Sequence, residues 1–346
     1  MPTMEIELEE QPSRSSMGKK PRWGTAQFLA LAAVPLLGYQ IWTLIAWSLS
    51  GPHQVLDHRS VGSTSWDAAW AIQIALSVIV VGIGVSLWRE YRRERRLTFD
   101  AMLFIGLLLT VFWDTVVNFV QPLWFYSTNW INLNDWWGHA PLVVSPAAGH
   151  GPFPVWALVV LYPCFLAECW LTSSILRAAR RRWPAISPAR LVIVAFVMAC
   201  SVGACLSMIM ILPHLWGGAG MGVSILGGDY RWPVAEFLYI GFWSTTLVSL
   251  RFFVDGRGHR LTERGLDHLR PTTRTTVRLL ATIAFCNLSV IVWSLPVLLT
   301  GFYARPYPNY PQHLSNVVCD TPALPAATAY GPCPGTAGFR IPLTQH

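Results

Sequence analysis

One carboxylate, Asp114, lies inside a long apolar stretch of the sequence, where an ionisable side chain is costly and usually has a function. Thr110, Asp114 and Asn118 are spaced by four residues, so in a helix they share one face, and Gln121 continues it. Such a polar stripe indicates a cavity, although hydrogen bonding to a neighbouring helix would also account for Asp114. We predict that Asp114 is catalytic and that Asn118 and Gln121 bind substrate.

Two glutamates lie in other apolar stretches. Glu168 could reach toward Arg177, which would give it a structural role, and Glu236 follows Pro233 near the predicted start of a helix. A carboxylate in the first turn of a helix is favoured by the helix dipole, so Glu236 also has a structural explanation. Both are kept as candidate catalytic residues.

The connection 120–152 contains polar residues among tryptophans and has no Lys or Arg. Asp135 and His139 are the candidate catalytic residues there. The connection also contains histidines that could bind a metal, but no pair has the i, i+4 spacing of a helical zinc site, so no metal is expected. Aromatic faces can stabilise a cation, which makes the tryptophans candidate substrate-binding residues. These are Trp113, Trp124 and Trp137.

Several carboxyl groups in a pocket that excludes water suit acid–base chemistry. One group can stay protonated while a more solvated partner stays ionised. The acid can protonate a carbonyl or hydroxyl oxygen, and its partner can accept the proton of an attacking hydroxyl. Loss of water, or ring closure through an oxocarbenium-like state, follows without a cofactor. We therefore expect no cofactor and a lipophilic small-molecule substrate.

The elements that position these residues are predicted from apolar length. Of the 346 residues, 53% are hydrophobic and 12% charged, whereas about a quarter of a soluble domain is charged. A helix of about 20 apolar residues crosses a membrane, and seven stretches qualify. They are 24–49, 65–87, 99–119, 153–176, 189–212, 234–253 and 277–300. We predict an all-α, polytopic membrane bundle of seven transmembrane helices, surrounded by membrane lipid.

The distribution of basic residues predicts the orientation. Of the 25 Lys and Arg residues, 21 fall in the N-terminal tail and in alternate connections, and connections rich in Lys and Arg stay in the cytoplasm. The predicted organisation is a disordered cytoplasmic tail (1–22), a seven-helix domain (23–302) and an extracytoplasmic tail (303–346), in a multi-pass plasma-membrane protein. Cys319 and Cys333 in the outer tail could form a disulfide.

Other function classes are excluded by residue content. The net charge of +7 does not indicate nucleic-acid binding, because the basic residues sit in short clusters between apolar stretches. A retinal protein needs a lysine in a helix for its Schiff base, and no lysine follows Lys20. Nucleotide-binding, zinc-protease and serine-hydrolase motifs are absent.

A resemblance is carried by three segments of the chain. They are Phe112-Trp113-Asp114-Thr115-Val116-Val117-Asn118, Trp124-Phe125-Tyr126 and Asn134-Asp135-Trp136-Trp137-Gly138-His139. Together with the length and the number of predicted spans, they resemble the spirocyclase AveC-like family. The resemblance implies an actinobacterial membrane enzyme of secondary metabolism that closes a dihydroxy-ketone polyketide to a spiroketal, with dehydration in some members. It assigns no catalytic residue, so the candidates above come from residue chemistry.

Two other functions remain open at this point. A membrane cyclase that closes an isoprenoid chain by protonation would use the same carboxylates. A non-catalytic protein that binds lipid or assists assembly would use Asp114 and Glu168 as structural contacts. The enzyme hypotheses predict that Asp114 shares a cavity with Glu168, Glu236 or Asp135.

Overall fold

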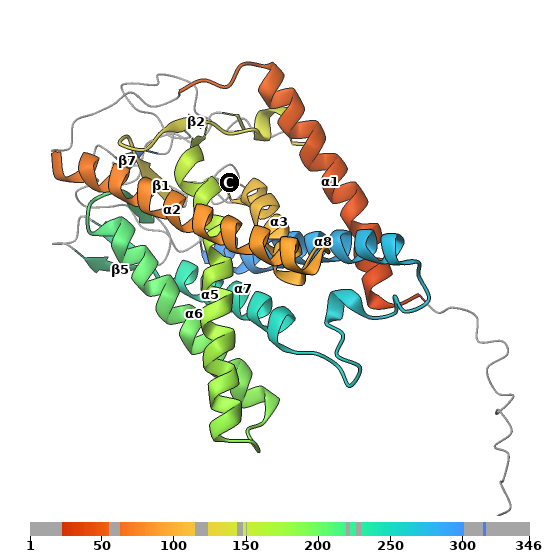
Figure 1. Cartoon of the computed structure of the whole chain (residues 1–346). Helices are drawn as coiled ribbons and strands as arrows, with labels where there is room; N and C mark the ends of the chain where they lie inside the picture. The colour runs from red at the N-terminus through yellow and green to blue at the C-terminus, as the bar shows by residue number, and fades with distance from the viewer. Residues whose placement is uncertain are drawn as a thin grey trace, which may run out of the picture.

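The computed structural model describes residues 23–54, 63–114, 124–143, 148–149, 151–218, 222–225, 230–300 and 314–315. The described residues are mostly helical (Figure 1). The α-helices are α1 (Thr25–Leu49), α2 (Ser63–Glu94), α3 (Phe99–Thr110), α5 (Val155–Arg182), α6 (Pro188–Ile211), α7 (Val234–Phe252) and α8 (Pro271–Thr300). Five of them, α1, α2, α5, α6 and α8, are long and apolar enough to cross a membrane, which identifies a membrane protein.

Helices α3, α5, α7 and α8 supply most of the buried core. Helix α5 packs against α2, α3, α6 and α7, and α1 lies on α8. The outer helices expose large apolar side chains, for example Trp42 on α1, Val78 on α2 and Val197 on α6. A helix that is apolar on both its inner and outer faces is expected where the surrounding solvent is lipid.

Helix α3 ends earlier than the predicted helix 99–119. The α-helix stops at Thr110, a 3-10 turn η1 (Val111–Trp113) follows, and Asp114 begins a turn. The last carbonyls of a helix need partners from outside it. Two side chains supply them here: Gln40 Nε2 donates to Leu109 O over 3.3 Å, and Trp136 Nε1 donates to Phe112 O over 3.2 Å. Residues 115–119 lie outside the described part.

Three small antiparallel sheets cover one end of the helices (Figure 1), a feature that the all-α prediction did not include. Strand β1 (Trp124–Ser127) pairs with β4 (Trp216–Gly218) and β7 (Leu314–Ser315). Strand β2 (Asn132–Asn134) pairs with β3 (Pro152–Pro154), and β5 (Gly222–Ile225) with β6 (Tyr230–Pro233). Buried connections must satisfy their backbone groups, and strands of two to four residues are too short to give a periodic sequence signal. We call these strands and their connections the cap.

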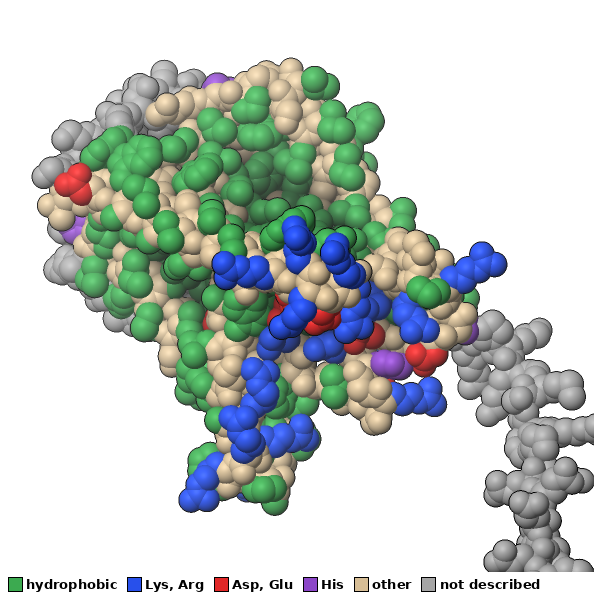
Figure 2. Space-filling model, viewed as in Figure 1, with side chains coloured by type: hydrophobic (Ala, Val, Ile, Leu, Met, Phe, Trp, Pro, Cys, Tyr) green, Lys and Arg blue, Asp and Glu red, His purple; other side chains and the backbone are tan. Residues whose placement is uncertain are grey.

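Arginines gather at the opposite end of the helices, below the apolar surface in Figure 2. They come from the end of α2, the end of α5 and the connection between α7 and α8, which contains the 3-10 turn η4 (Leu261–Glu263). The start of α1 is at this end too, because Gln27 Nε2 donates to Gly265 O over 2.8 Å. We call this the basic end.

The tail 1–22, Cys319 and Cys333 lie outside the described residues.

Candidate active site

A cavity lies where α5, α6 and α7 meet the cap. Its walls are mainly aromatic and aliphatic, and Asp114 is the one carboxylate among the described residues that line it. The free space is about 90 Å³, small beside the roughly 300–1,000 Å³ of pockets that enclose a whole drug-sized ligand. The cavity therefore accommodates one reacting segment of a molecule in the conformation described.

Two tyrosine hydroxyls hold the carboxylate of Asp114. Tyr162, on α5, donates to Oδ1 over 2.7 Å, and Tyr126, on β1 of the cap, donates to Oδ2 over 3.3 Å. All three side chains line the cavity, as does Tyr239 on α7. Among the described residues in the lining there is no Lys, Arg or His, so the polar side-chain groups there are one carboxyl group, phenol hydroxyls and indole N–H groups.

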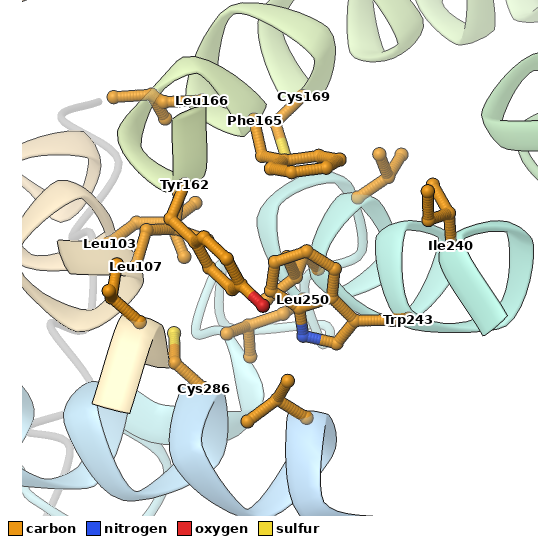
Figure 3. Close-up of a cluster of buried hydrophobic side chains, with 14 of the residues drawn as sticks. Leu103, Leu107, Tyr162, Phe165, Leu166, Cys169, Ile240, Trp243, Leu250 and Cys286 are labelled. Atoms are coloured by element: carbon orange, nitrogen blue, oxygen red, sulfur yellow. The ribbon is translucent and has the colours of Figure 1, made fainter. Parts of the chain in front are cut away.

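Trp243 on α7 places an indole N–H donor beside this group. The Trp243 and Tyr162 rings lie 5.5 Å apart between centroids, and Figure 3 shows the indole nitrogen and the Tyr162 hydroxyl directed toward the same region. Trp243 is 1% exposed, and within the described part of the chain its Nε1 has no hydrogen-bond partner. A buried N–H without an acceptor is unfavourable, so an oxygen atom of a ligand in the cavity would satisfy it.

Glu168 does not line this cavity. It lies six residues beyond Tyr162 on α5, roughly 9 Å along the helix axis at 1.5 Å per residue and toward the basic end. Ser244 Oγ donates to its Oε1 over 2.5 Å, and its Oε2 has no partner among the described residues. The structure therefore separates Glu168 from Asp114, and the two do not form the shared carboxylate site that the sequence suggested.

Asp135 organises the cap instead of lining the cavity. It accepts three backbone hydrogen bonds, from Trp137 N (2.8 Å), Gly149 N (2.9 Å) and Gly151 N (2.7 Å). Burial raises the pKa of Asp135 to about 6, although the three N–H donors lower it. His139 is also separate, with its Nε2 3.0 Å from Ser50 Oγ at the end of α1.

Of the three tryptophans proposed to bind substrate, two lie in the hydrophobic core, and the side chain of the third is outside the described part of the structure. Trp113 and Trp137 pack in the core with Phe112, and Trp113 Nε1 donates to Asn287 Oδ1 over 2.7 Å. Neither lines the cavity. Asn118 and Gln121, and the side chains of Trp124 and Glu236, lie outside what the structure describes.

Four residues that complete the site were not predicted from the sequence: Tyr126, Tyr162, Tyr239 and Trp243. Tyr162 could have been found as a phenol inside an apolar span, next to Pro163. The others gave no such signal, because tyrosine and tryptophan are also ordinary interface and core residues in membrane proteins. No group of three His, Cys, Asp or Glu side chains within the described ranges is placed to hold a metal ion.

The match to known proteins is at the level of the family. The model of the Spirocyclase AveC-like family matches residues 94–315, more than half of the chain, from the end of α2 to β7 and including every described residue of the cavity lining. No curated protein and no solved structure matches the chain. The chain belongs to the spirocyclase AveC-like family.

Proposed function

We propose that this member of the spirocyclase AveC-like family is a membrane enzyme that closes a lipophilic hydroxy-ketone of the polyketide type to a spiroketal, with loss of water and without a cofactor. One observation supports this most strongly: the carboxyl group of Asp114 is held by Tyr162 and Tyr126 at the wall of an aromatic cavity. Proton transfer by a positioned side chain contributes about 10²–10⁴-fold to a rate.

The proposed topology is seven spans in the plasma membrane, with the N-terminus inside. Five helices support it by length and composition, and α3 and α7 lie beside them in the core. The gathering of arginine-rich connections at one end, with the cap at the other, supports an orientation with the basic end in the cytoplasm. The cavity then lies toward the outer face.

The proposed reaction starts with Asp114 protonated. One substrate hydroxyl attacks the ketone carbon, so a C–O bond forms and the C=O π bond breaks. Asp114 gives its proton to the carbonyl oxygen and takes the proton of the attacking hydroxyl, which yields a hemiketal. Asp114 then protonates the hemiketal hydroxyl, which leaves as water. The second hydroxyl attacks the resulting oxocarbenium carbon and returns its proton to Asp114, so the proton balance closes.

The neighbouring groups have supporting roles in this scheme. The Tyr162 and Tyr126 hydroxyls orient the carboxyl group through their hydrogen bonds. The indole N–H of Trp243 donates to the ketone oxygen and later to a ring oxygen. The aromatic walls stabilise the cationic carbon. Because the free space is small, the ketone and the two hydroxyl-bearing arms that fold back onto it fill the cavity, while the rest of the substrate extends out of it.

A non-catalytic binding protein is the second candidate. Glu168 and Asp135 are each buried with their own hydrogen-bond partners, the arrangement expected of structural carboxylates. In that case the cavity would hold a lipid or a pathway intermediate without changing it.

Deleting the gene and profiling metabolites by mass spectrometry tests the enzyme proposal. We expect a compound one water heavier than the normal product to accumulate, because spiroketal closure releases one water. The wild-type gene should restore the product. An unchanged metabolite profile, or one in which only the amount of a finished product falls, would favour the binding protein.

A further inference from the structure

A second hollow lies at the basic end, between the ends of α5 and α7, far along α5 from the cavity of Asp114. Its volume is about 490 Å³. Arginines dominate its described lining and no acidic residue is part of it; the lining is Arg177, Arg180, Arg181, Arg251 and Arg260, with Phe252 and Val254. Asp100 pairs with Arg251 and Glu263 pairs with Arg260, so the net positive potential of the hollow comes mainly from the other three arginines.

Two of these arginines are held in place. Arg251 makes two hydrogen bonds to Asp100, Nε to Oδ1 over 2.9 Å and Nη2 to Oδ2 over 2.8 Å. Arg260 Nε donates to Arg251 O over 3.2 Å, and its guanidinium carbon lies 4.3 Å from the centre of the Phe99 ring. The inner wall of the hollow is therefore preorganised, which reduces the entropy lost when an anion binds.

The outer arginines, by contrast, are available. Arg177, Arg180 and Arg181 are exposed on the last turns of α5. Arg177 donates to Ser174 Oγ, and within the described part of the chain no ion pair joins Arg180 or Arg181 to a carboxylate. They can turn toward a ligand in the hollow without breaking an existing ion pair.

The orientation of the protein in the membrane does not by itself explain why arginines line this hollow. Cytoplasmic connections are rich in arginine for orientation, but a neighbouring hollow at the same end, which shares Arg251 and Arg260 with this one, is also lined by acidic residues. These are Glu90, Glu94, Asp100, Glu263 and Asp267. The acidic residues there compensate the charge, as the pairing of Glu263 with Arg278 shows. In the hollow at the end of α5, by contrast, the described residues supply no carboxylate partner to Arg177, Arg180 or Arg181.

The position of the hollow relative to the membrane indicates where an anion that binds there would come from. It lies where α5 and α7 end, at the basic end of the helices, where Figure 2 shows Lys and Arg side chains gathered below the apolar surface. Trp183, directly after α5, is 59% exposed, and exposed tryptophans mark the headgroup level of a membrane. Phe252 and Val254 add apolar contacts that a lipid could use and an inorganic anion could not.

We propose that this hollow binds the phosphate headgroup of an anionic phospholipid from the leaflet at the basic end. Guanidinium groups bind phosphate oxygens through paired hydrogen bonds, and basic pockets between helices on this side of a membrane suit such headgroups. The site is independent of the chemistry at Asp114.

The test compares two variants of equal charge. Arg180→Gln/Arg181→Gln removes two arginines of the hollow, and Arg92→Gln/Arg93→Gln removes two consecutive arginines at the end of α2 that do not line it. All four side chains are exposed, so both variants should fold. Each purified protein in a neutral detergent is titrated with phosphatidylglycerol, with phosphatidylcholine of the same acyl chains, or with inorganic phosphate. Native mass spectrometry counts bound lipid, and the melting temperature reports stabilisation.

Phosphatidylglycerol should bind the wild type and raise its melting temperature, with little effect of phosphatidylcholine or inorganic phosphate. Arg180→Gln/Arg181→Gln should bind about 25-fold more weakly, since each arginine near an anionic lipid contributes roughly a factor of five, and Arg92→Gln/Arg93→Gln should bind as the wild type does. Equal losses in both variants would overturn the site in favour of general charge attraction. Equal stabilisation by inorganic phosphate would overturn the lipid as the ligand.

Discussion

The Tyr162 hydroxyl donates a hydrogen bond to Oδ1 of Asp114 over 2.7 Å, which joins the first third of α5 to the end of η1. This contact places a carboxyl group and a phenol in one cavity although the two residues lie far apart in the sequence. It also identifies Tyr162 as a residue that orients Asp114.

Replacing Tyr162 with Phe should lower kcat by about 10- to 100-fold, because the carboxyl group loses its shorter hydrogen bond and with it the orientation needed for proton transfer. The measurement is the conversion rate of the precursor isolated from the deletion strain. Tyr39→Phe is the matched control: its hydroxyl donates to Pro141 O, outside the cavity, and activity should be retained. Equal rates in the two variants would exclude the proposed role of Tyr162.

Replacing Trp243 with Phe removes one N–H donor and keeps an aromatic ring. We expect kcat/KM to fall about tenfold, because that factor corresponds to the net free energy of one hydrogen bond to a substrate oxygen. Trp156→Phe is the control, because the Trp156 indole donates to Ser77 Oγ on the outer surface. An infrared spectrum of bound ketone gives a second readout, since loss of the donor should shift the carbonyl stretch to higher frequency. An unshifted band would mean that Trp243 does not contact the ketone.

The sequence predicted the membrane class and five long apolar helices, α1, α2, α5, α6 and α8, because these depend on local length and composition. It also selected Asp114, since a carboxylate in an apolar stretch is conspicuous. It could not predict that Glu168 pairs with Ser244 or that Asp135 accepts three backbone bonds, because those contacts arise from tertiary packing. Tyr126 joins the site only through pairing of β1 with β4 and β7, which no local pattern in the sequence indicates.

Gly151 should tolerate no side chain. A Cβ added there would lie 2.5 Å from Asp135 Oδ2, and Gly151 N is itself a donor to that oxygen. Gly151→Ala should therefore destabilise the protein by about 1–3 kcal/mol. Gly82→Ala in the middle of α2 meets no atom within 4 Å and should be neutral or stabilising. Unfolding in detergent compares the two, and similar melting temperatures would contradict the close packing at Asp135.

The stability of the cap should depend on pH through Asp135. Its pKa in the folded protein is raised to about 6, above about 3.9 for an unfolded aspartate. Between about pH 6 and pH 4 the folded state therefore binds more protons, so this residue's contribution to the free energy of unfolding increases as the pH falls and is lost as the pH rises through 6. The difference in unfolding free energy between wild type and Asp135→Asn should follow this slope, and a pH-independent difference would contradict the assigned pKa.

In the proposed reaction Asp114 transfers the protons of ring closure, and the variant Asp114→Asn is the sharpest test of that role. Asparagine keeps the shape of the side chain and an oxygen that can accept a phenol hydrogen bond, but it cannot exchange a proton. With the purified precursor and a folded variant, we expect the product one water lighter to form at least a hundredfold more slowly than with the wild type. Product formation at the wild-type rate by Asp114→Asn would contradict it.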